Sequence, residues 1–102
     1  MFLRDPVMTT FADVLHQAVG LYERGHMDEA VAGFKRALRI DPKSASALNA
    51  LGLCLANTGK AAEALAHLQR AIALKPDYAE AYLNLGLAYR RNLSFKLWGY
   101  GD

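Results

Sequence analysis

The fold is decided by residues 45–76, ASALNALGLCLANTGKAAEALAHLQRAIALKP, in which two apolar stretches flank a short turn at Gly59. The same pattern recurs 34 residues away in both directions along the chain. Upstream, the matched pairs are Gly25 and Gly59, Ala30 and Ala64, Phe34 and Leu68, Ala37 and Ala71, and Pro42 and Pro76. Downstream, they are Ala47 and Ala81, Leu48 and Tyr82, Leu51 and Leu85, Gly52 and Gly86, and Leu55 and Tyr89. A fixed period of this length indicates an array of structural repeats.

Each complete unit is predicted to contain two antiparallel helices. Gly25 and Gly59 are expected to end the first helix of their units, because glycine adopts a positive φ without strain. Pro42 and Pro76 are expected to end the second helix, because proline lacks an amide hydrogen and disfavours helix in the residue before it. Apolar residues recur at helical spacing in the first helix: Phe11, Val14, Leu15, Ala18, Leu21 and Tyr22.

Small residues are expected where the two helices of a pair cross. Gly52 with Ala64, and Ala18 with Ala30, occupy these positions and allow the backbones to approach closely. A large side chain at a crossing would cost roughly 1–3 kcal/mol through overpacking. The residues expected to fill the stacked core of the second unit are Leu48, Leu51, Leu55, Leu68 and Leu74.

The third unit departs from the pattern after one helix, which is predicted to run from Ala79 to about Arg91. Leu93 stands where the earlier units have Gly25 and Gly59, and the ending NLSFKLWGYGD contains no alanine-rich second helix. The expected organisation is therefore a flexible lead-in at 1–8, a repeat array at 9–91, and a divergent aromatic tail at 92–102. Within the array, the units span about 11–44, 45–78 and, as a partial unit, 79–91.

This pattern resembles the tetratricopeptide repeat (TPR) family. The second unit matches the family pattern nearly throughout: Leu48, Leu51, Gly52, Leu55, Gly59, Ala64, Leu68, Ala71 and Pro76. The first unit is looser, with Gln17-Ala18 in place of Leu-Gly, and the third stops matching after Tyr89. The resemblance covers roughly residues 11–91. It implies an all-α fold, a short right-handed α-solenoid of antiparallel helix pairs with about two and a half TPR units.

Composition excludes several functional classes. The 102 residues carry a formal net charge of +2, and no run of like charges indicates a nucleic-acid partner. No stretch is long and apolar enough for membrane insertion, and the N-terminal residues do not resemble a secretion signal. The single cysteine, Cys54, cannot form an intrachain disulfide, which favours a reducing compartment and a cytoplasmic location.

The sequence shows no catalytic, metal or cofactor site. Among the histidines, His16 and His67 are predicted within helices and His26 in a turn, and none has a metal-ligand partner at suitable spacing on a shared face. Cys54 is expected to be a buried, inert thiol. Thr58-Gly59-Lys60 lacks the preceding glycine and the following Ser or Thr of a phosphate-binding loop. We therefore expect no enzyme activity, no cofactor and no metal.

The resemblance implies a partner-binding groove, because in the family the first helices line a concave surface that receives extended or helical peptides. Asn49 and Asn57 are expected to hydrogen-bond a peptide backbone, and Arg90 and Arg91 to meet a carboxylate. The alternative is that these are simply solvated residues of that face. Unit one lacks the lysine and asparagine of the family's carboxylate clamp. The matching positions are Leu15, Val19, Tyr22, Glu23, Asn49, Leu53, Ala56, Asn57, Glu80, Leu83, Leu87, Arg90 and Arg91.

The C-terminal end is expected to expose apolar surface, because no second helix covers the helix of the third unit. Three alternatives stay open. The tail folds back as an irregular cap, two chains pair through their third units in a two-fold homodimer, or the chain is a piece of a longer array. The residues expected to take part in self-association are Tyr82, Tyr89, Phe95, Leu97 and Trp98.

These features favour a non-enzymatic scaffold that binds a peptide or protein partner in the concave groove and self-associates through its C-terminal end. The alternative is an N-terminal targeting segment of a larger multidomain enzyme, such as a glycosyltransferase or sulfotransferase.

Overall fold

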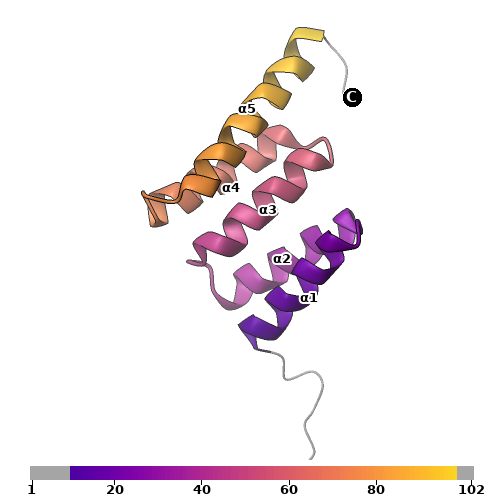
Figure 1. The fold of residues 1–102 in the computed structure, drawn as a ribbon, viewed down its shortest axis with the longest axis vertical. Helices are drawn as coiled ribbons and strands as arrows, with labels where there is room; N and C mark the ends of the chain where they lie inside the picture. Colours follow the sequence, from indigo (N-terminus) through magenta and orange to yellow (C-terminus); the bar gives the residue numbers. More distant parts are fainter. Residues whose placement is uncertain (1–9, 99–102) are drawn as a thin grey trace, which may run out of the picture.

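The computed structural model describes residues 10–98, except for the side chains of Phe95 and Trp98. Its helices are α1 (Phe11–Glu23), α2 (Met27–Ile40), α3 (Ala45–Asn57), α4 (Ala61–Leu74) and α5 (Ala79–Trp98). α1 pairs with α2 and α3 with α4, and α5 packs against the second pair (Figure 1). The described residues contain no strand, and the all-α solenoid predicted from the repeat is confirmed. The predicted lead-in at 1–8 and residues 99–102 lie outside the described part of the chain.

The helices begin and end at residues with clear local causes. The Thr10 hydroxyl accepts a hydrogen bond from the Asp13 amide at 3.1 Å, and the Ser44 hydroxyl accepts one from the Ala47 amide at 3.1 Å. Such side-chain caps satisfy amides that have no partner within the helix. Gly25 and Gly59 follow the first helices with φ values of 84° and 83°, a conformation that favours glycine.

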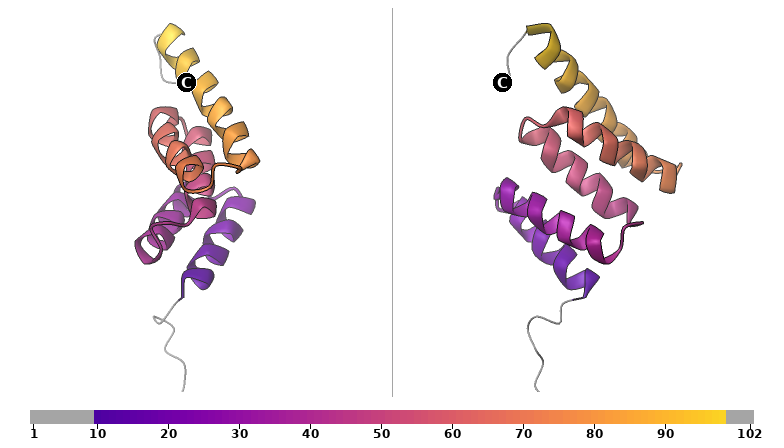
Figure 2. Two further views of the ribbon diagram at one scale, coloured as in Figure 1. Left: turned by 90° about the vertical axis from the view of Figure 1, so that its left-hand side faces the viewer. Right: turned by 180° about the vertical axis from the view of Figure 1, so that it is seen from behind.

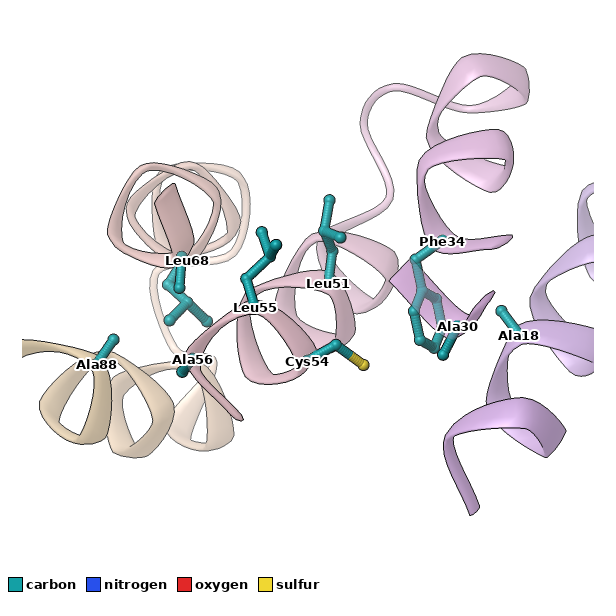
Figure 3. Close-up of a cluster of buried hydrophobic side chains, with 10 residues drawn as sticks. Ala18, Ala30, Phe34, Leu51, Cys54, Leu55, Ala56, Leu68 and Ala88 are labelled. Carbon is teal, nitrogen blue, oxygen red and sulfur yellow. The ribbon is translucent and has the colours of Figure 1, made fainter. Parts of the chain in front are cut away.

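The core forms where successive pairs stack. Leu51, Leu55 and Cys54 of α3 lie between Phe34 of α2 and Leu68 of α4, and all five are fully buried (Figure 3). Burial of these side chains is the main source of stability in a molecule of this size. The expectation that Leu74 belongs to this core is wrong, because its side chain is 40% exposed at the end of α4.

Glycines allow close helix crossings in both pairs. A Cβ atom added at Gly52 would lie 2.5 Å from Cγ of Leu68, and one added at Gly33 would lie 2.8 Å from Cβ of Ala18. The glycine is therefore on the first helix in one pair and on the second helix in the other. The sequence indicates the crossing at Gly52, whereas Gly33 is recognised only from its contact with Ala18.

α5 is longer than the helix expected from the repeat pattern. It extends to Trp98 and has 20 residues, whereas the expected helix ends at about Arg91. No glycine or proline interrupts residues 87–98, and Leu93 cannot replace the positive-φ glycine that ends α1 and α3. Residues 92–98 therefore continue the helix, and no part of them folds back as an irregular cap.

The helices form two layers. α1, α3 and α5 lie on the face turned to the viewer in Figure 1, and α2 and α4 lie on the face seen from behind in Figure 2. α5 projects past the turn between α3 and α4 (Figure 2). Two surfaces follow from this arrangement, the face shared by the first helices and the side of α5 that points away from the array.

Candidate protein-binding surfaces

The predicted groove residues come from α1, α3 and α5, which share one face of the molecule (Figure 1). Apart from Glu80, which is exposed in the first turn of α5, they form rows across the three helices at intervals of 34 residues. Most are exposed or half-buried, while Asn49 and Ala56 are buried. The rows are Leu15, Asn49 and Leu83; Val19, Leu53 and Leu87; Tyr22, Ala56 and Arg90; and Glu23, Asn57 and Arg91.

Asn49 connects two helices. Its side-chain oxygen accepts a hydrogen bond from Nδ2 of Asn84 at 2.9 Å, and the two residues are only 4% and 7% exposed. A buried polar group of this kind is stable only with a partner. Asn49 therefore fixes α5 to α3 and does not project from the shared face. Asn84, its partner, was not among the predicted functional residues, although a polar residue stands there where the preceding unit has Ala50.

The two neighbouring arginines of α5 have different roles. Nη1 of Arg91 donates to the carbonyl of Ala56 at 3.0 Å and to Oδ1 of Asn57 at 2.9 Å. A cation suits this position, because the last carbonyls of α3 carry partial negative charge. Arg90 is exposed and makes no hydrogen bond or ion pair with any side chain that the structure describes. Of the two, Arg90 is the one available to a ligand.

A hollow of about 540 Å³ follows the exposed side of α5. It is lined by Leu83, Leu87 and Arg90 and also reaches Tyr82, Asn84 and Gly86, and Leu83 is 74% exposed. Arg90 lies at its C-terminal end and also lines a second hollow, of about 510 Å³, next to Lys60 at the start of α4. The surface therefore changes along α5 from apolar to cationic.

The side of α5 that points away from the array is called here the open face, and Gly86 marks its middle. Tyr82 and Tyr89 are 49% and 50% exposed, although their counterparts Leu48 and Leu55 in the second unit are each 1% exposed. A Cβ atom added at Gly86 would meet nothing within 4 Å. The open face consists of Tyr82, Gly86, Tyr89, Leu93 and Leu97.

Most of the residues predicted for self-association lie on the open face. Tyr82, Tyr89 and Leu97 are on it, whereas the side chains of Phe95 and Trp98 lie outside the described part of the structure. Leu93, which is 56% exposed, was missed by the sequence prediction because the helix was expected to end before it.

The tyrosine hydroxyls of the open face already have partners within the chain. The Tyr82 hydroxyl donates to the carbonyl of Pro76 at 3.0 Å, and the Tyr89 hydroxyl accepts from Nε2 of Gln69 at 3.1 Å. The half-exposed rings therefore offer a partner mainly apolar surface.

The cysteine and the two histidines considered next occupy positions that the fold itself accounts for. Burial raises the pKa of the Cys54 thiol to about 11, so little reactive thiolate forms at neutral pH. Burial also lowers the pKa of His67, an effect that nearby Glu63 opposes. His26 precedes α2 and its Nδ1 lies 2.8 Å from Oε1 of Glu29. Within residues 10–98, no three His, Cys, Asp or Glu side chains are grouped to hold a metal ion.

The described helices also include none with the length and apolar character needed to cross a bilayer. The two layers of paired helices and the regular rows of residues 34 apart define the molecule as a helical-repeat protein. Residues 21–59 and 55–92 each match the family model described as TPR repeat. The chain therefore belongs to the tetratricopeptide repeat family, as the sequence pattern indicated. No curated protein matches the chain.

Proposed function

We propose that this chain is a non-enzymatic scaffold that binds a peptide segment of a protein partner along the face shared by α1, α3 and α5. TPR repeats generally mediate protein–protein interaction. The observation that carries the proposal is the hollow beside α5, where Leu83 is 74% exposed next to Leu87 and Arg90. A ligand that covers this large apolar side chain removes apolar surface from water, which favours binding.

The chemistry of the hollow favours a peptide that combines an apolar residue with an acidic group. The apolar residue would cover Leu83 and Leu87, and the acidic group would meet Arg90. Lys60 adds a second positive charge at the same end. A guanidinium can bind a carboxylate through two parallel hydrogen bonds, which fixes the direction of the peptide.

Two leucines of α5 provide a matched test. Leu83→Ser changes the shared face, and Leu93→Ser makes the same substitution on the open face of the same helix. Both leucines are more than half exposed, so neither change removes a buried side chain. Peptides are selected from an unbiased library with the parent chain, and their affinities for both variants are measured by calorimetry.

We expect Leu83→Ser to weaken binding by about tenfold, which corresponds to about 1.4 kcal/mol, and Leu93→Ser to leave it unchanged. Arg90→Gln should weaken acidic peptides selectively and make their binding less sensitive to salt. Equal affinity for the parent and the Leu83→Ser variant would remove the shared face from the proposal.

Two further proposals concern the context of the scaffold. The exposed residues of α5 support self-association through the C-terminal end of the array. The single buried thiol, Cys54, supports placement in a reducing compartment such as the cytoplasm. In the alternative proposal, a targeting segment of a larger enzyme, the same face would bind the protein to which the enzyme is directed.

A further inference from the structure

We infer that a second copy of this chain covers the open face of α5, with the two α5 helices antiparallel about a two-fold axis between residues 87 and 88. This inference rests on the self-association included in the proposed function and specifies the residues and the direction of pairing. Its starting point is the difference between α3 and α5. Residues of α3 that α4 covers are buried, and their counterparts Tyr82, Gly86 and Tyr89 are exposed.

The space at Gly86 fits a bulky side chain. At the equivalent Gly52, the side chain of Leu68 fills the position so closely that an added Cβ would lie 2.5 Å from its Cγ. At Gly86 the same space is empty within the described residues. An exposed glycine costs a helix about 1 kcal/mol relative to alanine, so a packing partner is the natural reason for it.

The open face is complementary to itself in the antiparallel direction. Gly86 and Tyr89 are equally distant from the proposed axis, so each tyrosine ring would lie over the glycine of the partner copy. Tyr82 and Leu93 are also equally distant and would lie opposite each other. The pairing therefore matches each large side chain with a small or apolar one along the same stripe.

Charge along α5 favours the same direction. Asp77 lies just before the helix and Glu80 lies in its first turn, whereas the C-terminal half carries Arg90 and Lys96, with Arg91 turned toward α3. Antiparallel pairing places the basic half of each helix beside the acidic end of the other, and it also opposes the two helix dipoles. Parallel pairing would place like charges together.

The first experiment measures the oligomeric state of the whole chain by sedimentation velocity over a concentration series. A single helix pair is expected to form an interface smaller than the roughly 1,200–2,000 Å² of standard complexes. We therefore expect a weak dimer, with a dissociation constant between about 1 μM and about 1 mM. A chain that remains monomeric up to about 1 mM, or that grows into open-ended assemblies, overturns the inference.

Two glutamine substitutions test the surface. Gly86→Gln places a side chain where the partner's Tyr89 would lie, while the open space around Gly86 means that the monomer tolerates it. Ser94→Gln is the control, since Ser94 is exposed on α5 but lies off the open face. We expect Gly86→Gln to weaken the dimer at least about tenfold with unchanged helicity by circular dichroism, and Ser94→Gln to leave it unchanged. A dimer unaffected by Gly86→Gln uses another surface.

Cross-linking tests the direction. In a Cys54→Ala background, chains carrying Tyr82→Cys are mixed with chains carrying Leu93→Cys and oxidised. Antiparallel pairing predicts mixed disulfides between the two variants, whereas parallel pairing predicts disulfides within each variant alone. Dominance of the second product overturns the inference while self-association stands.

The hollow beside Leu83 reaches Gly86, so the dimer and peptide binding are distinguished by separate measurements, the oligomeric state and the peptide affinity. If the chain is monomeric and Leu83→Ser abolishes peptide binding, the proposed binding function stands and the dimer is ruled out. A dimer that selects no peptide keeps the inference and loses the groove.

Discussion

Gly52 and Gly86 occupy the same position in successive repeats and meet opposite surroundings. Gly52 is buried against Leu68, and Gly86 faces open space. One glycine is thus required by a contact that the structure contains, and the other is not required by any contact within residues 10–98. Comparing the same substitution at both glycines therefore separates the free energy of packing from helix propensity.

We predict that Gly52→Ala is less stable than Gly86→Ala by about 1–3 kcal/mol, the cost of overpacking a close crossing. Each substitution gains about the same helix propensity, close to 1 kcal/mol, so this gain cancels in the comparison. Gly86→Ala alone should be more stable than the parent chain. Urea unfolding followed by circular dichroism at low micromolar concentration measures both values. Equal stabilities would mean that Leu68 moves aside at no cost.

At the scale of elements, α5 is attached to α3 by two polar contacts, one buried and one at the C-terminal end of α3. The buried contact joins Asn49 and Asn84, and the other joins Arg91 to Ala56 and Asn57. These hydrogen bonds fix the position of α5 relative to α3 in an interface that is otherwise apolar, because hydrogen bonds form only within narrow ranges of distance and angle.

We predict that Arg91→Ala lowers the free energy of unfolding by about 1 kcal/mol, the contribution of a hydrogen-bonded and largely exposed guanidinium. Arg90→Ala serves as the control and should change it by less than about 0.5 kcal/mol. Thermal or urea unfolding of the two variants provides the measurement. An equal effect of both substitutions would show that the bonds to Ala56 and Asn57 contribute nothing beyond helix propensity and surface charge.

At the scale of the whole molecule, stability is expected to differ along the array. α3 packs against α2, α4 and α5, whereas α1 makes its main contacts with α2 alone. In a repeat protein, stability is approximately a sum of terms within units and between neighbours. The middle pair therefore has the largest share of stabilising neighbours, and the ends have less.

We predict that amide hydrogens exchange most slowly in α3 and α4 and fastest in the last turns of α5, beyond Asn92. The cause is local opening of segments that have few buried contacts. Hydrogen exchange monitored by mass spectrometry, at a concentration where the chain is monomeric, gives the comparison. Uniform protection over residues 11–98 would contradict the prediction and indicate all-or-none unfolding.

Much of this architecture was predictable, because repeated small and apolar residues report which side of each helix is buried. The period located the helix pairs, and Gly25 and Gly59 located the turns within them.

The remaining features depend on relations that a repeat pattern does not contain. The bond between Asn49 and Asn84 joins residues from different units and requires the actual separation of α3 and α5. The exposure of Leu74 depends on where α4 ends relative to its neighbours. The length of α5 depends on the absence of a stop signal, and its open face became complete only with Leu93.

The open space at Gly86 also has a use in protein engineering. Because α5 repeats the spacing of α3, it offers a ready acceptor site for a grafted copy of residues 59–74 in place of residues 93–98. In such a chimera, the grafted counterpart of Leu68 would settle onto Gly86 as Leu68 settles onto Gly52. The grafted helix would complete the third unit, and it would bury the exposed tyrosines of α5 in an extended core.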